Sequence, residues 1–187
     1  MHEKRHHSGF TIIELMITLV VASILLGIAA PSFRDIIKDG RLTAQINTLG
    51  ASLNLARSEA VKRSTIVSVC RSNDGTSCSG NWKDGWIVFQ DIDGKGDVDA
   101  GDDEIIRVSP ALTSGNTLSY PSSFITYSST GFGNVSGAGT FVLCDDRTSP
   151  EKYAKALVMS PIGRVRVAID TNSNGIVEGG SGDVSCP

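Results

Sequence analysis

Histidine is missing from all but the first few positions of this sequence. The 187-residue chain has 3 histidines, and all of them, His2, His6 and His7, lie ahead of residue 8. If that segment is removed, no imidazole remains to act as a general acid or base, or as a zinc ligand. The sequence also has no nucleophile elbow and no base placed to activate a serine. We therefore expect a protein that is not an enzyme and that holds no metal or cofactor.

The chain also lacks an excess of positive charge. The chain has 17 Lys and Arg residues against 20 Asp and Glu residues, a net charge of −3 at pH 7. A protein of this composition does not attract polyanions through its overall field. Any contact with nucleic acid must therefore come from a local cluster of basic side chains.

One long apolar run lies near the N-terminus. It extends from Phe10 to Ala30, just before Pro31, and as a helix its 21 residues would span roughly 31 Å, about one hydrocarbon core. Glu14 is the one charged residue in the run, and a carboxylate in lipid needs a partner. Nothing nearby in sequence supplies that partner. An amine made by cutting between Gly9 and Phe10, on this chain or on an adjacent copy, would supply it.

The stretch G-F-T-I-I-E-L at 9–15 with its apolar helix resembles the N-terminus of type IV prepilins and type II secretion pseudopilins. The resemblance implies that prepilin peptidase cuts after Gly9, that Phe10 is then N-methylated, and that Glu14 pairs with a neighbouring subunit's amine during assembly. Pro31 matches a helix-kinking proline common in that family. The implied location is the bacterial inner membrane, crossed once with the soluble domain in the periplasm, and then a surface-exposed pilus built with other major and minor pilins.

The pattern after residue 31 predicts an α+β fold of the type IV pilin kind. A single apolar stripe, spaced by four and three residues, predicts a helix lying on a core: Leu42, Ile46, Leu49, Leu53, Ala56 and Ala60. Short β-branched segments then predict strands at 65–70, 85–91, 104–109, 123–128, 140–144, 155–160 and 164–169. We expect a leader at 1–9, a hydrophobic transmembrane and assembly helix at 10–36, and a soluble domain at 37–187, in which a helix (37–63) packs on an antiparallel β-sheet domain (64–187).

The 4 cysteines, Cys70, Cys78, Cys144 and Cys186, predict disulfides in a domain held outside the cytoplasm. Three pairings are possible. Loop closure favours the close pair Cys70–Cys78, which leaves Cys144–Cys186. A zinc site is disfavoured because this cysteine spacing is not a common zinc spacing and no histidine remains.

Two acidic stretches and one tryptophan have alternative interpretations. Residues 91–104 and 170–178 match part of a calcium-loop pattern, but neither has the glutamate expected at the last position, and both also fit glycine-rich hairpin turns. Trp82 is a candidate for an exposed stacking platform, although no aromatic residue neighbours it closely enough to support that role.

Two arginines alternate with valines in the stretch P-I-G-R-V-R-V-A-I-D at 161–170. In a strand, Arg164 and Arg166 would share one face. The simplest interpretation is a solvated strand face whose charge is balanced by Asp145, Asp146 or Asp170.

Three motifs resemble the FimT/GspH group of minor pilins and pseudopilins: L-N-L-A-R-S-E-A-V-K-R-S at 53–64, W-I-V-F-Q-D at 86–91 and D-E-I-I-R at 103–107. Within that group, G-R-V-R at 163–166 is similar to the G-R-x-R motif of the FimT members, which bind DNA during natural transformation. The resemblance implies a site for double-stranded DNA made by Gly163, Arg164 and Arg166, with Lys152 and Lys155 extending it. The alternative is a GspH-like minor pseudopilin of a type II secretion system, with a structural role and no DNA binding.

Overall fold

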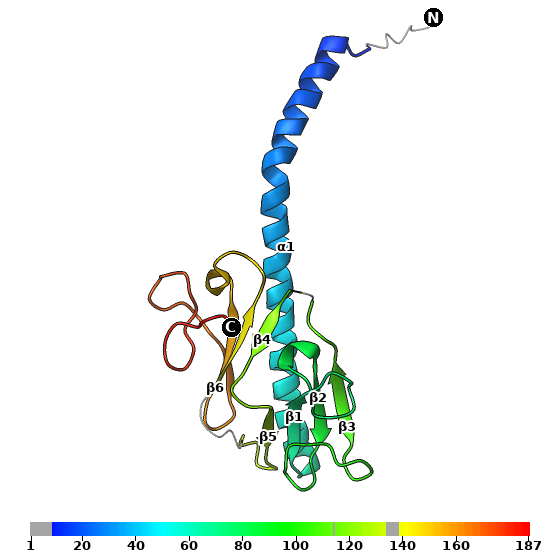
Figure 1. The fold of residues 1–187 in the computed structure, drawn as a ribbon, viewed down its shortest axis with the longest axis vertical. Coiled ribbons are helices and arrows are strands. Elements are labelled where there is room, and N and C mark those ends of the chain that lie inside the picture. Colours follow the sequence, from blue (N-terminus) through cyan, green and yellow to red (C-terminus); the bar gives the residue numbers. More distant parts are fainter. Residues whose placement is uncertain (1–8, 114, 134–138) are drawn as a thin grey trace, which may run out of the picture. The chain divides into compact units, whose positions relative to one another are not determined.

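The computed structural model describes residues 9–113, 115–133 and 139–187, so the three histidines and residues 1–8 of the expected leader lie outside the described residues. The chain divides into two compact units, Met1–Asp39 and Gly40–Pro187. One helix, α1 (Ile12–Arg63), runs through the boundary between them (Figure 1). The sequence prediction of one long N-terminal helix is therefore confirmed.

The strands form two four-stranded antiparallel sheets, where the sequence had suggested one. The first sheet has the order β3-β2-β1-β5 and the second β4-β6-β7-β8. Their bounds are β1 Val67–Arg71, β2 Trp86–Gln90, β3 Ile105–Ser109, β4 Thr117–Ser119, β5 Phe124–Tyr127, β6 Gly139–Cys144, β7 Lys155–Met159 and β8 Val165–Val167, with short 3-10 helices η1 Trp82–Asp84 and η2 Pro150–Lys152. All seven expected strands are present, and β4 is the one that the sequence did not predict.

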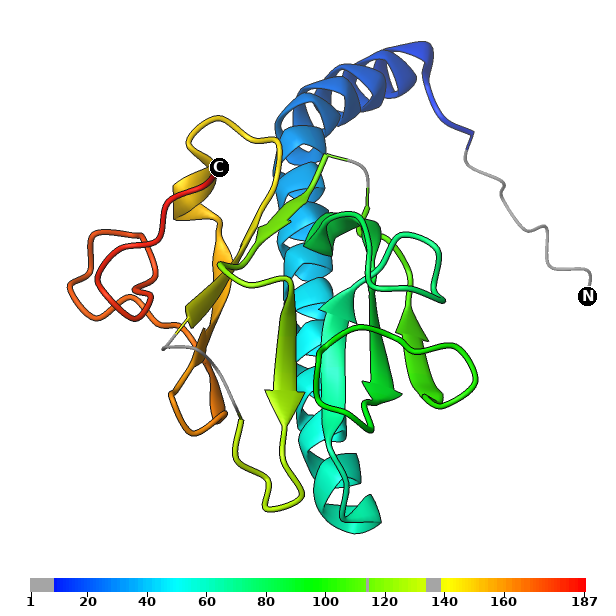
Figure 2. The same cartoon turned by 60° about the horizontal axis from the view of Figure 1, so that its bottom comes forward.

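The second half of α1 provides the surface on which both sheets pack. Figures 1 and 2 show both sheets beside this part of the helix. The predicted apolar stripe is confirmed, since all six of its residues are buried. They share one core cluster with Val69, Trp86 and Ile125 of the first sheet and with Phe141, Leu143 and Leu157 of the second. One amphipathic helix therefore joins two sheets that would otherwise have separate cores.

The second sheet has a further apolar layer on the face opposite α1. Val142, Ala156 and Val158 lie there in a small cluster with Val184 from the C-terminal segment. A disulfide, Cys144–Cys186, ties that segment back to β6. The other disulfide, Cys70–Cys78, closes the loop after β1, so the bonds follow the pairing that loop closure favoured.

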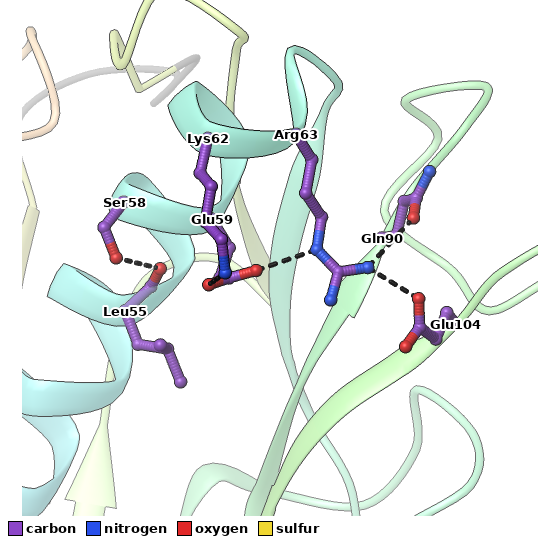
Figure 3. Close-up of polar contacts among 7 residues, drawn as sticks. All are labelled: Leu55, Ser58, Glu59, Lys62, Arg63, Gln90 and Glu104. Atoms are coloured by element: carbon purple, nitrogen blue, oxygen red, sulfur yellow. Dashed lines mark hydrogen bonds and ion pairs between the residues drawn. The ribbon is translucent and has the colours of Figure 1, made fainter.

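A single arginine fastens the end of α1 to the first sheet (Figure 3). Arg63 Nε donates to Glu59 at 2.7 Å within the helix, and Arg63 Nη1 donates to Glu104 at 2.6 Å and to Gln90 at 3.3 Å. The bond from Arg63, with a further one from Lys62, lowers the pKa of the Glu59 carboxyl below its usual value. The pKa of Arg63 is raised by the same partners, Glu59 first and Glu104 second.

We expect Arg63→Gln to destabilise the fold in a pH-dependent way. A carboxyl whose folded-state pKa is lowered stabilises the fold above its unfolded value of about 4.5, and this contribution disappears as the pH falls through the folded value. Thermal melts should show a lower Tm than the parent at pH 7 and a smaller difference at pH 3. Lys62→Gln, which removes an exposed charge from the same carboxyl, is the control and should change Tm less. An equal loss at both pH values would contradict the ion-pair explanation.

Candidate functional site

The turn between β7 and β8 sets the position of the two arginines. The Gly163 N–H donates to the Ser160 carbonyl at 2.9 Å, and the Ser160 N–H donates to the Arg164 carbonyl at 2.9 Å. This is the bonding of a three-residue hairpin loop, in which the last residue has left-handed backbone angles. Gly163 has φ +77°, while Pro161 fits the first loop position because its ring fixes φ. The stretch Pro161–Gly163 therefore specifies the turn locally.

Gly163 also lies against a second hairpin, which leaves no room for a side chain. A Cβ atom there would lie 2.6 Å from the Gly133 nitrogen and 2.9 Å from Tyr127 Cε1. The Tyr127 hydroxyl donates to the Gly163 carbonyl at 3.3 Å. Burial raises the pKa of Tyr127, so this hydroxyl keeps its proton. The glycine of G-R-V-R thus fixes the backbone from which the arginines project.

Arg164 and Arg166 share the face of the second sheet that lies away from α1. Arg166 is directly opposite Val158 on β7, and both arginines are exposed. Among the residues that the structure describes, neither guanidinium makes a hydrogen bond or an ion pair. Two of the three suggested balancing carboxylates are engaged elsewhere: Asp145 pairs with Arg147 at 2.6 Å, and Asp170 accepts the N–H groups of Ser173 and Gly175. The pair therefore presents two guanidiniums to solvent.

The two lysines lie apart from the arginines. Lys155 begins β7, three residues before Val158, which is roughly 10 Å along the strand. Alternation along β7 directs Lys155 to the face opposite that of Val158 and Arg166. Lys152 is exposed in η2. The structure thus brings Gly163, Arg164 and Arg166 together and leaves Lys152 and Lys155 outside that group.

A third arginine, which sequence reasoning did not single out, stabilises the segment before β7. Arg147 is almost completely buried against Asp145, and its Cζ lies 3.6 Å from the centroid of the Tyr153 ring. This ion pair and cation–π contact hold residues 145–153 in place. The charge of Arg147 is thus paired with Asp145 within the fold.

Glu14 has a hydrogen-bond partner close by in sequence, where the sequence analysis expected none. The Thr11 N–H donates to Glu14 Oε2 at 3.1 Å, and the Glu14 N–H donates to Thr11 Oγ1 at 3.3 Å. This reciprocal pair is a capping box at the start of α1. The signal was present as T-x-x-E at residues 11–14 but was not used. Gly9 and Phe10, ahead of the cap, are exposed.

The remaining candidates have structural explanations. Asp91 is buried and accepts bonds from the Gly94 and Gly96 N–H groups and from Ser68 Oγ, so it closes its own loop. Across the part of the chain that the structure describes, no group of three or more His, Cys, Asp or Glu residues is placed to hold a metal ion. Trp82 is buried, contrary to the exposed position suggested for it, because its ring packs edge-on against Phe141 and Tyr120. Its indole N–H donates to the Ser122 carbonyl at 2.9 Å.

The fold and the N-terminal sequence define a protein of the type IV pilin class. The family model described as Type II transport protein GspH matches residues 45–163, more than half of the chain, and a prokaryotic N-terminal methylation motif matches residues 4–30. The chain therefore belongs to the GspH family of minor pilins and pseudopilins.

Two crystal structures of a type IV minor pilin show the same fold. The type IV minor pilin FimU of Pseudomonas aeruginosa (strain PAO1) is 20% identical, with a TM-score of 0.56 over 71% of this chain and 91% of that one. A second crystal form of FimU gives 21% identity and a TM-score of 0.53 over 68% and 92%. The minor pseudopilin EpsH of the Vibrio cholerae type II secretion system gives 15% identity and a TM-score of 0.47 over 68% and 95%. Comparison with curated proteins finds no significant match.

The N-terminal half of α1 is long and apolar enough to cross a membrane. Together with the methylation motif, this makes the protein membrane-anchored with a single span.

We expect Gly163→Ala to displace the arginines as well as to destabilise the fold. Alanine in the left-handed region costs about 1–2 kcal/mol by itself, and here its Cβ would also meet the Gly133 backbone. Gly175→Ala is the matched control, because Gly175 has φ +87° but nothing within 4 Å of a Cβ. Thermal melts should show a clearly larger loss for Gly163→Ala. Equal losses would mean that the contact with Gly133 is unimportant.

Proposed function

We propose that this protein is a minor type IV pilin that binds double-stranded DNA through Arg164 and Arg166, without sequence preference, for uptake in natural transformation. The observation that carries the proposal is the pair of exposed, unpaired guanidiniums on a hairpin whose backbone is fixed by Gly163. Residues two apart on a strand lie about 6.6–7 Å from each other along the backbone, and each guanidinium can form two hydrogen bonds to a phosphate.

A fixed hairpin lowers the cost of binding. Side chains that must be ordered on association weaken it, so cations held on a defined backbone lose less freedom than cations on a mobile loop. Because both arginines contact phosphates rather than base edges, they carry no sequence information. Lys152 and Lys155 add positive charge at a greater distance, so we expect them to contribute less.

The N-terminal residues account for delivery to the pilus. In this proposal, prepilin peptidase cuts after Gly9, Phe10 is N-methylated, and Glu14 interacts with the amine of a neighbouring pilin. The protein is held in the inner membrane with residues 37–187 in the periplasm, and is then assembled into a surface-exposed pilus. The capping box engages Glu14 Oε2, which leaves Oε1 available for such an amine.

A second function is favoured by the description of the matching family, Type II transport protein GspH. In this alternative the protein is a minor pseudopilin that contacts other tip subunits of a secretion system and binds no DNA. The two functions are distinguished by measuring whether the protein binds DNA through Arg164 and Arg166.

The first test is the salt dependence of DNA binding by the full chain in neutral detergent micelles. Each phosphate contact contributes about 0.9 to the slope of log affinity against log salt, so the double change Arg164→Gln and Arg166→Gln should lower the slope by about 1–2. Fluorescence anisotropy with a labelled duplex should show a parent Kd of roughly 10⁻⁴–10⁻⁶ M. The Tm should stay unchanged, because both side chains are exposed.

Lys152→Gln and Lys155→Gln are the controls, since each removes one positive charge away from the arginine face and should weaken binding less. Duplexes of unrelated sequence should bind alike. A double arginine variant that binds DNA like the parent, with the same slope, would favour the pseudopilin function.

The second test separates the charge of Glu14 from its role in the helix cap. Glutamine can replace glutamate in a capping box, so Glu14→Gln keeps the bonds to Thr11 but removes the charge. If the charge pairs with an amine during assembly, Glu14→Gln and Glu14→Ala should both insert in the membrane yet be missing from sheared pilus fractions. If Glu14→Gln is recovered in pili at the parent's level, the charge of Glu14 is not needed for assembly and the residue acts as a helix cap.

A further inference from the structure

The outer face of the β7–β8 hairpin contains a groove that phosphate binding alone does not explain. Its volume is about 340 Å³, and it is lined by Val158, Ser160, Ile162, Arg164, Val165 and Arg166. Three of these six residues are aliphatic, and the two arginines are the proposed phosphate contacts. Apolar surface beside two unpaired cations fits a ligand that has both an anionic and an apolar part.

Ile162 is the exposed apolar element of the groove, and its backbone is held in place. Its side chain is 45% exposed at the hairpin turn. The Gly133 N–H donates to the Ile162 carbonyl at 3.4 Å, and the neighbouring Gly163 packs on Gly133. Phe132, which precedes Gly133, is also exposed, at 56%. Exposed apolar side chains that gather at one place, rather than singly, mark binding surfaces.

DNA offers the matching chemistry when its bases are unpaired. In a duplex the bases are stacked inside and the phosphates are outside, so a duplex would contact the arginines and leave the groove unfilled. A single strand presents the apolar face of a base next to its own phosphates. Proteins bind such strands by combining a positive groove with aromatic side chains on which bases stack, and here aliphatic side chains take that place.

We infer that this groove accepts one unstacked base, so that the arginine site binds single-stranded DNA, or a frayed duplex end, more tightly than intact duplex. The inference rests on the proposed function, in which Arg164 and Arg166 bind DNA phosphates. Ile162 and Val158 contact the base, and the two guanidiniums hold phosphates of the same strand.

The test compares three labelled DNAs of equal length on the full chain in neutral detergent micelles: oligothymidine, an abasic phosphodeoxyribose strand, and a duplex. Oligothymidine should bind about fivefold more tightly than the abasic strand, the lower end of what stacking on an aromatic side chain supplies, because the side chains here are aliphatic. Ile162→Ser should remove most of that difference and leave the affinity for the abasic strand and the duplex unchanged.

Ile169→Ser is the matched control, because Ile169 is 60% exposed in the same segment but does not line the groove. It should leave all three affinities unchanged. If Ile162→Ser lowers the Tm, the β-branched variant Ile162→Thr replaces it. Equal binding of oligothymidine and the abasic strand, or no effect of either Ile162 variant, would overturn the inference while the phosphate site stands. Failure of all three DNAs to bind would overturn the proposed function itself.

Discussion

The burial of one helical stripe is the constraint on which the rest of the soluble unit depends. Both four-stranded sheets pack on residues 40–63 of α1, and each has a smaller apolar cluster on its outer face, formed with Cys78 and Val98 from neighbouring loops on the first sheet and with the C-terminal segment on the second. Full burial of each large aliphatic residue of the stripe, such as Leu42 or Leu53, stabilises the fold by about 1.5–3 kcal/mol. The small residues Ala56 and Ala60 let the strands approach the helix closely. The same helix thus orients both sheets. Because the arginine hairpin is part of the second sheet, its position also depends on this helix.

Several features of the fold could be predicted from the sequence because they are local. The alternating four- and three-residue spacing of the stripe is the period of a helix, and the β-branched runs are typical of strands. Each of these signals lies within a single element. The division into two sheets could not be predicted, because a strand sequence does not reveal its partner. β4 was missed because its three residues, Thr117–Ser119, are too short to show alternation. The Thr11–Glu14 cap is also local, since T-x-x-E lies within four consecutive residues.

The candidate site shows the same division between local and long-range information. The sequence supplied Gly163, Arg164 and Arg166 as a motif, and alternation correctly placed both arginines on one face. It could not show why the first residue is glycine, since Gly133 and Tyr127, which contact it, belong to a turn about thirty positions earlier. Nor could it separate Lys155 from the arginines, because that depends on the face to which each position of β7 points. The groove beside Ile162 likewise exists only after the turn has folded.

In the proposed function, DNA binding depends on the hairpin rather than on the fold as a whole. The core that holds the two sheets together does not include the side chains of Arg164 and Arg166, so they can be gained or lost with little effect on stability. One architecture can therefore carry different functions in different proteins. In this chain, the two exposed guanidiniums have no partner among the described residues, and a glycine contact fixes the backbone that carries them. A purely structural subunit would have no need of that combination, and it is the physical reason for preferring the DNA-binding function.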